Sequence, residues 1–161
     1  MKANRIRFLS TAAVIGALYT VLTLFSATFG LAIGPFEFRL SEALTILPVF
    51  TPAAVPGLFV GCLVANLLCG AAVPDLIFGS LASLLGALGT YLFRSKKILP
   101  YLSPIVANTV IIPPILYFVY GFCESGFLLL FLAFLVGEAV SAGGGGFLLR
   151  RALLPFQKHL K

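Results

Sequence analysis

Long apolar segments that contain few charges dominate the hydrophobic pattern of this chain. A shorter apolar segment, residues 41–51, begins with Ser41, a residue type that often caps a helix, and ends at Thr51 before a proline. Five segments have 20 or more residues, enough for a helix to cross a hydrocarbon layer of about 30 Å: residues 8–29, 52–71, 74–93, 98–120 and 127–149. The pattern predicts six membrane-crossing helices, of which the second is tilted or partial.

The composition agrees with a membrane protein. Of the 161 residues, 60% are hydrophobic and 10% are charged, whereas about 25% of the residues of an average soluble protein are charged. A water-soluble fold of this size has too little interior to bury so much apolar surface. We therefore expect an all-α integral membrane protein in which residues 1–161 form a single membrane domain. The first apolar segment is longer than that of a secretory signal peptide, which favours a membrane helix.

The positive charges predict an orientation. Ten of the eleven Lys and Arg residues fall in three groups, which are Lys2, Arg5 and Arg7; Arg94, Lys96 and Lys97; and Arg150, Arg151, Lys158 and Lys161. Six helices place all three groups on one side of the membrane, whereas five helices would separate them. The positive-inside rule makes that side cytoplasmic, together with both termini. The net charge of +6 is then a consequence of topology, and we expect no nucleic-acid partner.

The acidic residues lie away from these basic groups. Glu37, Asp75 and Glu124 fall on the expected outer loops, together with Arg39, and Glu42 lies just inside the second helix. A ligand site is therefore expected to open outward. For Glu42 a structural alternative exists, because a carboxylate near a helix N-terminus is stabilised by about 0.3–1 kcal/mol.

Three polar residues within the apolar segments are candidates for ligand binding. Glu138 lies near the middle of the last segment, where a carboxylate costs about 2.5–3.5 kcal/mol on insertion scales. No basic residue lies in the long apolar segments to pair with it. Asn66 and Asn108 each carry an amide that both donates and accepts hydrogen bonds. Hydrogen bonding between helices is the structural alternative for all three.

Small residues form smooth faces on the first and last predicted helices. Ala13 and Ala17 are four residues apart, as are Ala12 and Gly16, and such a face lets another helix of the chain or of a partner approach closely. The run Gly143–Gly146 is expected to serve the same purpose. It lacks the Lys-Ser/Thr pair that follows a phosphate-binding loop.

The chain offers little for catalysis. Its single histidine, His159, lies in the C-terminal tail, and no metal-ligand spacing is present. We therefore expect no catalytic, metal or cofactor site. Cys62, Cys69 and Cys123 form no Cys-x-x-Cys pair and are expected to pack as small apolar residues, while a bond between Cys69 and Cys123 stays open.

The stretch FEFRLSEALTILP spans residues 36–48. It is followed by GCLVANLL, by PDLIFGSLASLLGALGTY and by a glutamate in the last helix. Together these segments resemble the queuosine-precursor transporter family. Its members are substrate-binding S components of energy-coupling factor (ECF) transporters. The resemblance covers nearly the whole chain, and RLSEAL is its most specific part. It implies a six-helix S-component bundle in a bacterial plasma membrane. Ala13 and Ala17 match the AxxxA pattern that docks on the transmembrane coupling subunit, and two cytoplasmic ATPases would supply ATP hydrolysis.

The resemblance also implies a substrate, a deazaguanine that carries a cyano or an aminomethyl group. A carboxylate and amides suit the edge of a guanine-like ring, and an aminomethyl cation would require a second carboxylate, for which Glu42 is the candidate. The expected substrate-binding residues are Glu138, Asn66, Asn108, Glu42 and Arg39. The alternatives are an S component for another vitamin-like molecule and a structural membrane protein without transport activity.

Overall fold

The computed structural model describes residues 2–30, 38–121 and 126–156. Within these ranges the chain forms helices and no β-strand. The elements are α1 (Lys2–Thr28), η1 (Leu40–Val49), α2 (Ala54–Leu68), η2 (Asp75–Gly79), α3 (Ser80–Leu92), α4 (Leu99–Phe118), α5 (Phe127–Glu138), η3 (Ala139–Gly145), α6 (Gly146–Leu153) and η4 (Leu154–Phe156). Glu37, Cys123, Glu124 and the tail with His159 lie outside the described ranges.

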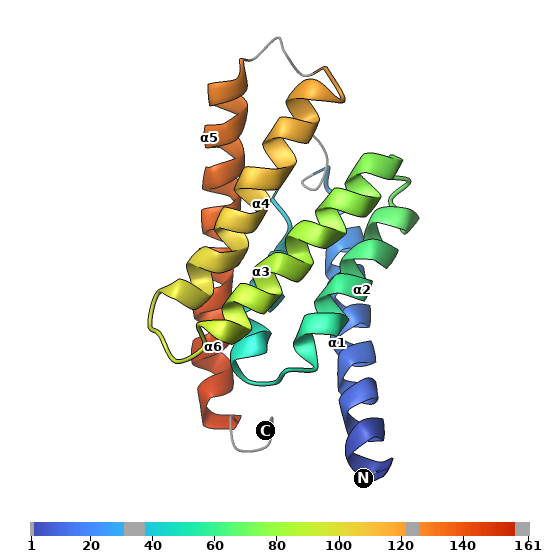
Figure 1. Cartoon of the computed structure of the whole chain (residues 1–161), viewed down its shortest axis with the longest axis vertical. Helices are drawn as coiled ribbons and strands as arrows, with labels where there is room; N and C mark the ends of the chain where they lie inside the picture. The colour runs from blue at the N-terminus through green and yellow to red at the C-terminus, as the bar shows by residue number, and fades with distance from the viewer. Residues whose placement is uncertain (1, 31–37, 122–125, 157–161) are drawn as a thin grey trace.

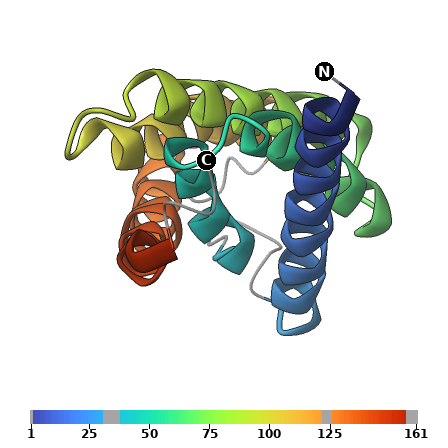
Figure 2. The same ribbon diagram turned by 90° about the horizontal axis from the view of Figure 1, so that it is seen from below.

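The helices form a bundle in which successive passes run in opposite directions (Figure 1). Seen from below, α2, α3 and α4 make one layer, and α1, η1 and the continuous α5–η3–α6 helix make the other (Figure 2). The element η1 lies at the centre and packs against α1, α3, α6 and η3. Residues of η1 are therefore placed where they can meet side chains from most of the bundle.

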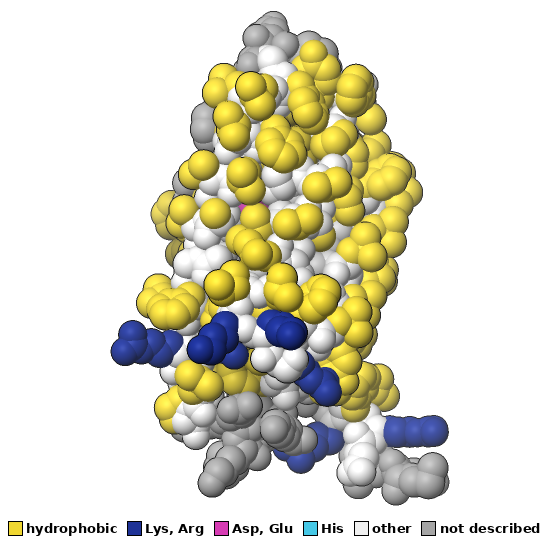
Figure 3. Space-filling model, turned by 60° about the vertical axis from the view of Figure 1, so that its left-hand side comes forward, with side chains coloured by type: hydrophobic (Ala, Val, Ile, Leu, Met, Phe, Trp, Pro, Cys, Tyr) yellow, Lys and Arg dark blue, Asp and Glu magenta, His cyan; other side chains and the backbone are white. Residues whose placement is uncertain are grey.

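The distribution of polarity is that of a membrane protein. Large apolar side chains such as Val14, Leu18 and Leu128 are exposed, whereas a set of polar side chains within the helices, Glu42 and Asn108 among them, is buried. Figure 3 shows apolar side chains over most of the height of one face. Lipid is the favourable environment for such a surface. Polar side chains are therefore placed inside the bundle, and the helices satisfy the hydrogen bonds of the backbone.

Four helices of the described chain are long and apolar enough to cross a membrane: Asn4–Thr28, Asp75–Leu92, Leu99–Phe118 and Phe127–Leu153. The two other passes are shorter than the expected 52–71 and 41–51. Helix α2 has 15 residues and η1 has 10, which correspond to lengths of about 22 Å and about 20 Å. These passes do not span a full hydrocarbon layer as single straight helices.

Ser41 does not cap η1, so that prediction is wrong. The residue before η1 is Arg39, which makes no side-chain capping bond. The Ser41 hydroxyl instead accepts a hydrogen bond from Thr23 Oγ1 on α1, at 2.8 Å. Nearby, the backbone N–H of Leu40 donates to Ser26 Oγ at 3.1 Å. The start of η1 is thus attached to α1 by long-range bonds that no local pattern reveals.

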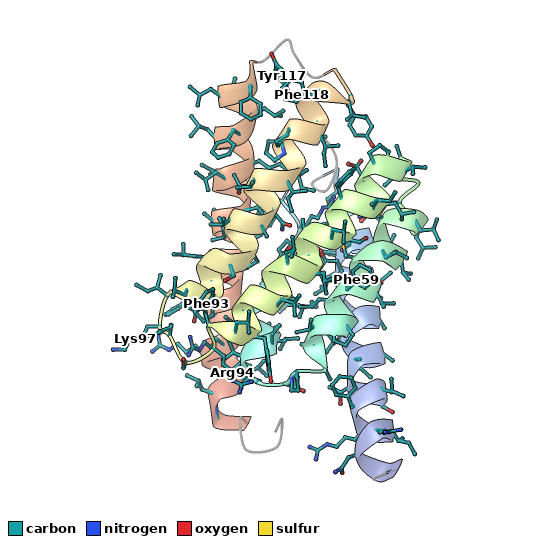
Figure 4. The ribbon with its side chains drawn as sticks, in the orientation of Figure 1. Phe59, Phe93, Arg94, Lys97, Tyr117 and Phe118 are labelled. Carbon is teal, nitrogen blue, oxygen red and sulfur yellow. The ribbon has the colours of Figure 1, made fainter. Side chains whose placement is uncertain are left out.

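The described members of the three basic groups lie at one end of the bundle. The N-terminus, the connection between α3 and α4 and the end of α6 lie together at the lower end (Figure 1). Figure 3 shows dark-blue Lys and Arg side chains gathered there. In Figure 4, Arg94 and Lys97 lie at this end, and Tyr117 and Phe118 lie at the opposite end of α4. Phe93 also lies at the basic end, and basic residues at one interface with aromatic residues at both are typical of membrane proteins.

Candidate functional site

A hydrogen-bonded polar cluster lies inside the bundle and joins three of the predicted residues. The amide Nδ2 of Asn108, on α4, donates to Oε1 of Glu138 at 3.0 Å and to Oε2 of Glu42 at 3.3 Å. Glu138 ends α5, and Glu42 lies in the first turn of η1. All three side chains are at most 5% exposed. The structure therefore brings two acids, from opposite halves of the sequence, onto one amide group.

Tyr19 is a fourth member of this cluster, and the sequence analysis missed it. It lies on α1, is fully buried, and its hydroxyl donates a hydrogen bond to Oε1 of Glu42. A tyrosine in the middle of an apolar segment is a weak signal for such a role, because a buried phenol usually finds a hydrogen-bond partner. Both carboxyl oxygens of Glu42 thus accept hydrogen bonds from other helices, which accounts for its burial better than a helix dipole does.

Arg39 and Asn66 form a second polar pair beside the cluster. Arg39 Nη1 lies 3.5 Å from Asn66 Oδ1, to which it donates. The amide Nδ2 of Asn66 donates to the backbone carbonyl of Asp75 at 3.2 Å. The positive charge of Arg39 also attracts the carboxylate of Glu42. The five predicted binding residues therefore fall into a bonded group of three, Glu42, Asn108 and Glu138, and a bonded pair, Arg39 and Asn66.

The backbone at Glu138 departs from an ordinary α-helix. Directly after Glu138 the chain forms η3, a π-helical segment over Ala139–Gly145. Such widened turns are rare, and they occur frequently at functional sites. The widened turn carries Ser141, which is 5% exposed and whose Oγ has no hydrogen-bond partner among the described residues. The buried hydroxyl of Thr109, next to Asn108, likewise has no hydrogen-bond partner among the described residues. The sequence analysis singled out neither Ser141 nor Thr109.

The cluster has a defined chemical preference. Two carboxyl groups next to each other repel when both are ionised, and the low polarity around them strengthens that repulsion. A ligand that carries N–H donors or a positive charge removes the repulsion and supplies charge-assisted hydrogen bonds. The amide of Asn108 and the guanidinium of Arg39 add donors for a carbonyl or ring nitrogen. The arrangement is suited to a flat, N–H-rich and preferably cationic small molecule.

The two small-residue faces of α1 have different surroundings. A Cβ atom added to Gly57 of α2 would lie 2.6 Å from the carbonyl oxygen of Ala12, so the Ala12 and Gly16 face packs within the chain. Ala13 and Ala17 are exposed instead. They line an apolar groove of about 720 Å³ between α1 and α2 on the surface of the bundle, to which Ala12 and Gly16 also contribute. This groove is available to a partner helix.

Other polar residues lie at the end of the bundle opposite the basic groups. The hydroxyl of Tyr120 donates to Asp75 Oδ2 at 2.9 Å and joins the end of α4 to η2. Partial burial, followed by the neighbouring Asp75 carboxylate, raises the pKa of Tyr120. Cys62 packs in the core as expected, whereas Cys69 is exposed, and the two described cysteines form no disulfide with each other.

Comparison with known proteins adds two similarities. A family model described as "QueT transporter" matches residues 9–154. The chain is also similar to "Queuosine precursor transporter QueT" of Lactococcus lactis subsp. cremoris (strain MG1363), with 33% identity over 98 residues. That match spans 60% of this chain and 57% of the relative. No solved structure matches the chain significantly.

Proposed function

The chain belongs to the QueT transporter family, whose model covers residues 9–154, and from that premise we propose that it is the substrate-binding S component of an ECF importer. It is a multi-pass membrane protein. Its proposed substrate is a deazaguanine precursor of queuosine that carries a cyano or an aminomethyl group. The name of the Lactococcus relative supports the substrate class.

The buried cluster of Glu42, Asn108 and Glu138 is the observation that carries this proposal. A guanine-like edge has adjacent N–H donors, which one carboxylate accepts in a fork. We assign this fork to Glu138 and assign an aminomethyl cation to Glu42. Asn108 is a donor that both acids already share. Asn66 and Arg39 provide donors for the ring carbonyl.

The cluster is closed in this structure, because Glu42, Asn108 and Glu138 are almost fully buried. Ligand binding therefore exchanges hydrogen bonds within the protein for hydrogen bonds to the ligand. Such an exchange costs little net free energy when every buried polar group finds a new partner. It also explains selectivity, since a ligand that lacks the required donors leaves buried acceptors unpaired.

In the proposed transport cycle the energy comes from partner subunits. The exposed face of Ala13 and Ala17 would dock on the transmembrane coupling subunit, because small side chains allow close contact between helix backbones. Two cytoplasmic ATPases would hydrolyse ATP, and this chain would act as the binding subunit and not as an enzyme.

A ligand panel tests the proposal. Purified protein is titrated in a calorimeter with aminomethyl-deazaguanine, cyano-deazaguanine, guanine and several vitamins, and its thermal unfolding is followed with each. A ligand at about 100 times its dissociation constant adds about 2.7 kcal/mol to the free energy of unfolding. We expect binding of at least one deazaguanine. Binding of a vitamin in its place would support an S component with another substrate, and no binding at all would support a structural role.

A further inference from the structure

A second groove lies at the basic end of the bundle, away from the buried cluster. It has a volume of about 640 Å³ and is lined by Ile98, Tyr101, Gly143 and Phe147, with Leu154 at its end. Its remaining lining residues are three cations, Lys97, Arg150 and Arg151. The groove is therefore apolar along the helices and positively charged at one end. Figure 4 places Lys97 at the lower end of the bundle, between α3 and α4.

No described acid neutralises these three cations. Of the acids that the structure describes, Glu42 and Glu138 are in the buried cluster and Asp75 bonds to Tyr120 at the opposite end. Arg150 is held in place, because its Nη1 donates to the Tyr101 hydroxyl at 3.3 Å and its guanidinium lies 5.7 Å from the centre of the Tyr101 ring. Lys97 and Arg151 are exposed. The end of the groove is thus built to receive negative charge.

The glycine run Gly143–Gly146 borders this groove at Gly143. Gly145 fits the expectation of close helix contact, since an added Cβ would lie 2.9 Å from Ala43 Cβ. Gly144 would meet nothing within 4 Å, and Gly143 would meet one side-chain atom of Ile105 at an ordinary 3.5 Å. Packing inside the protein therefore does not require glycine at positions 143 and 144. The missing side chain at Gly143 instead leaves space on the surface beside Phe147.

We propose that this groove binds one anionic phospholipid, with its phosphate between Lys97, Arg150 and Arg151 and an acyl chain along Gly143 and Phe147. Basic pockets between helices at the cytoplasmic interface are suited to anionic headgroups. Lys and Arg side chains reach the headgroup level while their stems cover apolar surface. The bound lipid joins the α3–α4 connection to α6. This inference does not depend on the transported substrate.

The experiment uses the absence of tryptophan from the sequence. Phe147 is 53% exposed, so Phe147→Trp introduces one fluorophore in the groove with little effect on packing. The protein is reconstituted in vesicles of phosphatidylcholine and phosphatidylglycerol, in which either lipid carries brominated, quenching acyl chains. We expect brominated phosphatidylglycerol to quench the introduced tryptophan more strongly than the same mole fraction of brominated phosphatidylcholine.

Charge variants identify the source of that preference. Lys97→Gln with Arg151→Gln should lower the relative affinity for phosphatidylglycerol about 25-fold, from about 1 kcal/mol for each removed charge. Arg5→Gln with Arg7→Gln removes the same charge from α1 and should leave the preference intact. Equal loss in both variants, or quenching that follows bulk composition, would overturn the proposal. Native mass spectrometry of the unsubstituted protein is a second readout, and retention of phosphatidylcholine as readily as phosphatidylglycerol would also refute it.

Discussion

At the scale of single residues, Asn108 connects the site. Its amide nitrogen has two N–H groups, and the two acids that accept from it belong to different elements. Replacement of Asn108 by an apolar residue would remove a donor from two buried carboxyl groups at once. The cost of such unpaired groups is about 1–3 kcal/mol each, so the cluster, the proposed binding site, is also a link between η1, α4 and α5.

Glu138→Gln separates these two roles. The variant keeps an oxygen that accepts from Asn108 but replaces the other with an N–H donor that would face the N–H groups of the ligand. We expect ligand affinity to fall about 10- to 150-fold, from the loss of a charge-assisted bond of about 1.5–3 kcal/mol. The ligand-free protein should be as stable or more stable, because a carboxylate within a membrane is costly. Calorimetry and thermal unfolding measure the two quantities.

Asp75→Asn is the matched control, since Asp75 is an acid away from the cluster that bonds to Tyr120. It should leave ligand affinity near that of the unsubstituted protein. Normal affinity in Glu138→Gln, with lowered stability, would remove Glu138 from the binding site and assign it a structural role.

Tyr19→Phe tests the member of the cluster that the sequence analysis missed. The substitution removes the hydroxyl that donates to Glu42 and leaves a buried carboxyl oxygen without that donor. We expect the free energy of unfolding to fall by about 1.5–3 kcal/mol. Tyr91→Phe is the control, because Tyr91 contacts Arg94 through its ring and not its hydroxyl. If both variants unfold at the same temperature as the unsubstituted protein, the Tyr19 bond contributes nothing to stability.

At the scale of elements, α1 shows how two similar patterns acquire different roles. The Ala12 and Gly16 face meets Gly57 and Gly61 of α2 at backbone contact distance. The Ala13 and Ala17 face, rotated by one residue, lies on the outside. Since successive residues of a helix are about 100° apart, a shift of one position is enough to exchange an internal face for an external one.

Ala13→Trp combined with Ala17→Trp tests the proposed docking of α1. Two bulky side chains would hold a partner helix away, so we expect uptake and copurification with the coupling subunit to be lost. Ligand binding by the isolated chain should persist, because both residues are exposed. Gly61→Leu is the contrasting variant: an added Cβ would lie 2.7 Å from the Gly16 carbonyl oxygen, so it should impair folding. Loss of ligand binding in the doubly substituted variant would argue against a docking role.

At the scale of the whole molecule, charge and polarity are arranged along two directions. On the outside, large apolar side chains are exposed, and the interior combines an apolar core with buried polar groups such as Glu42 and Glu138. Along the bundle, the basic residues Arg94 and Lys97 lie at one end, whereas aromatic residues lie at both ends, with Phe93 at the basic end and Tyr117 at the opposite one (Figure 4). The exposed apolar surface places the bundle in lipid, and the basic end predicts its orientation.

Cysteine labelling tests that orientation in intact cells. In one variant Cys69 is the only cysteine, and in another Ser95→Cys is combined with removal of the three native cysteines. Ser95 is exposed and lies between Arg94 and Lys96 at the basic end, whereas exposed Cys69 follows α2 at the other end. We expect an impermeant thiol reagent to label Cys69 from outside and to label position 95 after permeabilisation. The reverse pattern would invert the predicted topology.

The helical membrane class and the polar candidates could be predicted from sequence, because lipid imposes strong local conditions. A backbone in hydrocarbon must satisfy its own hydrogen bonds. Long apolar segments therefore had few alternatives to an α-helix. Glu138 and Asn108 stood out because polar side chains are costly in such segments. The basic groups likewise predicted a common end, and their described members lie together at one end.

The tertiary structure decided which of these groups meet. Asn108 is 66 residues from Glu42 and 30 from Glu138, and periodicity predicts the face of a helix but not its neighbour across the bundle. The bond from Tyr19 to Glu42, the pairing of Ser41 with Thr23 and the exposure of Ala13 follow from the same packing. Hydrophobic pattern is a property of one segment in one environment, whereas a site requires several segments to be placed against each other, and close packing of their side chains determines that placement.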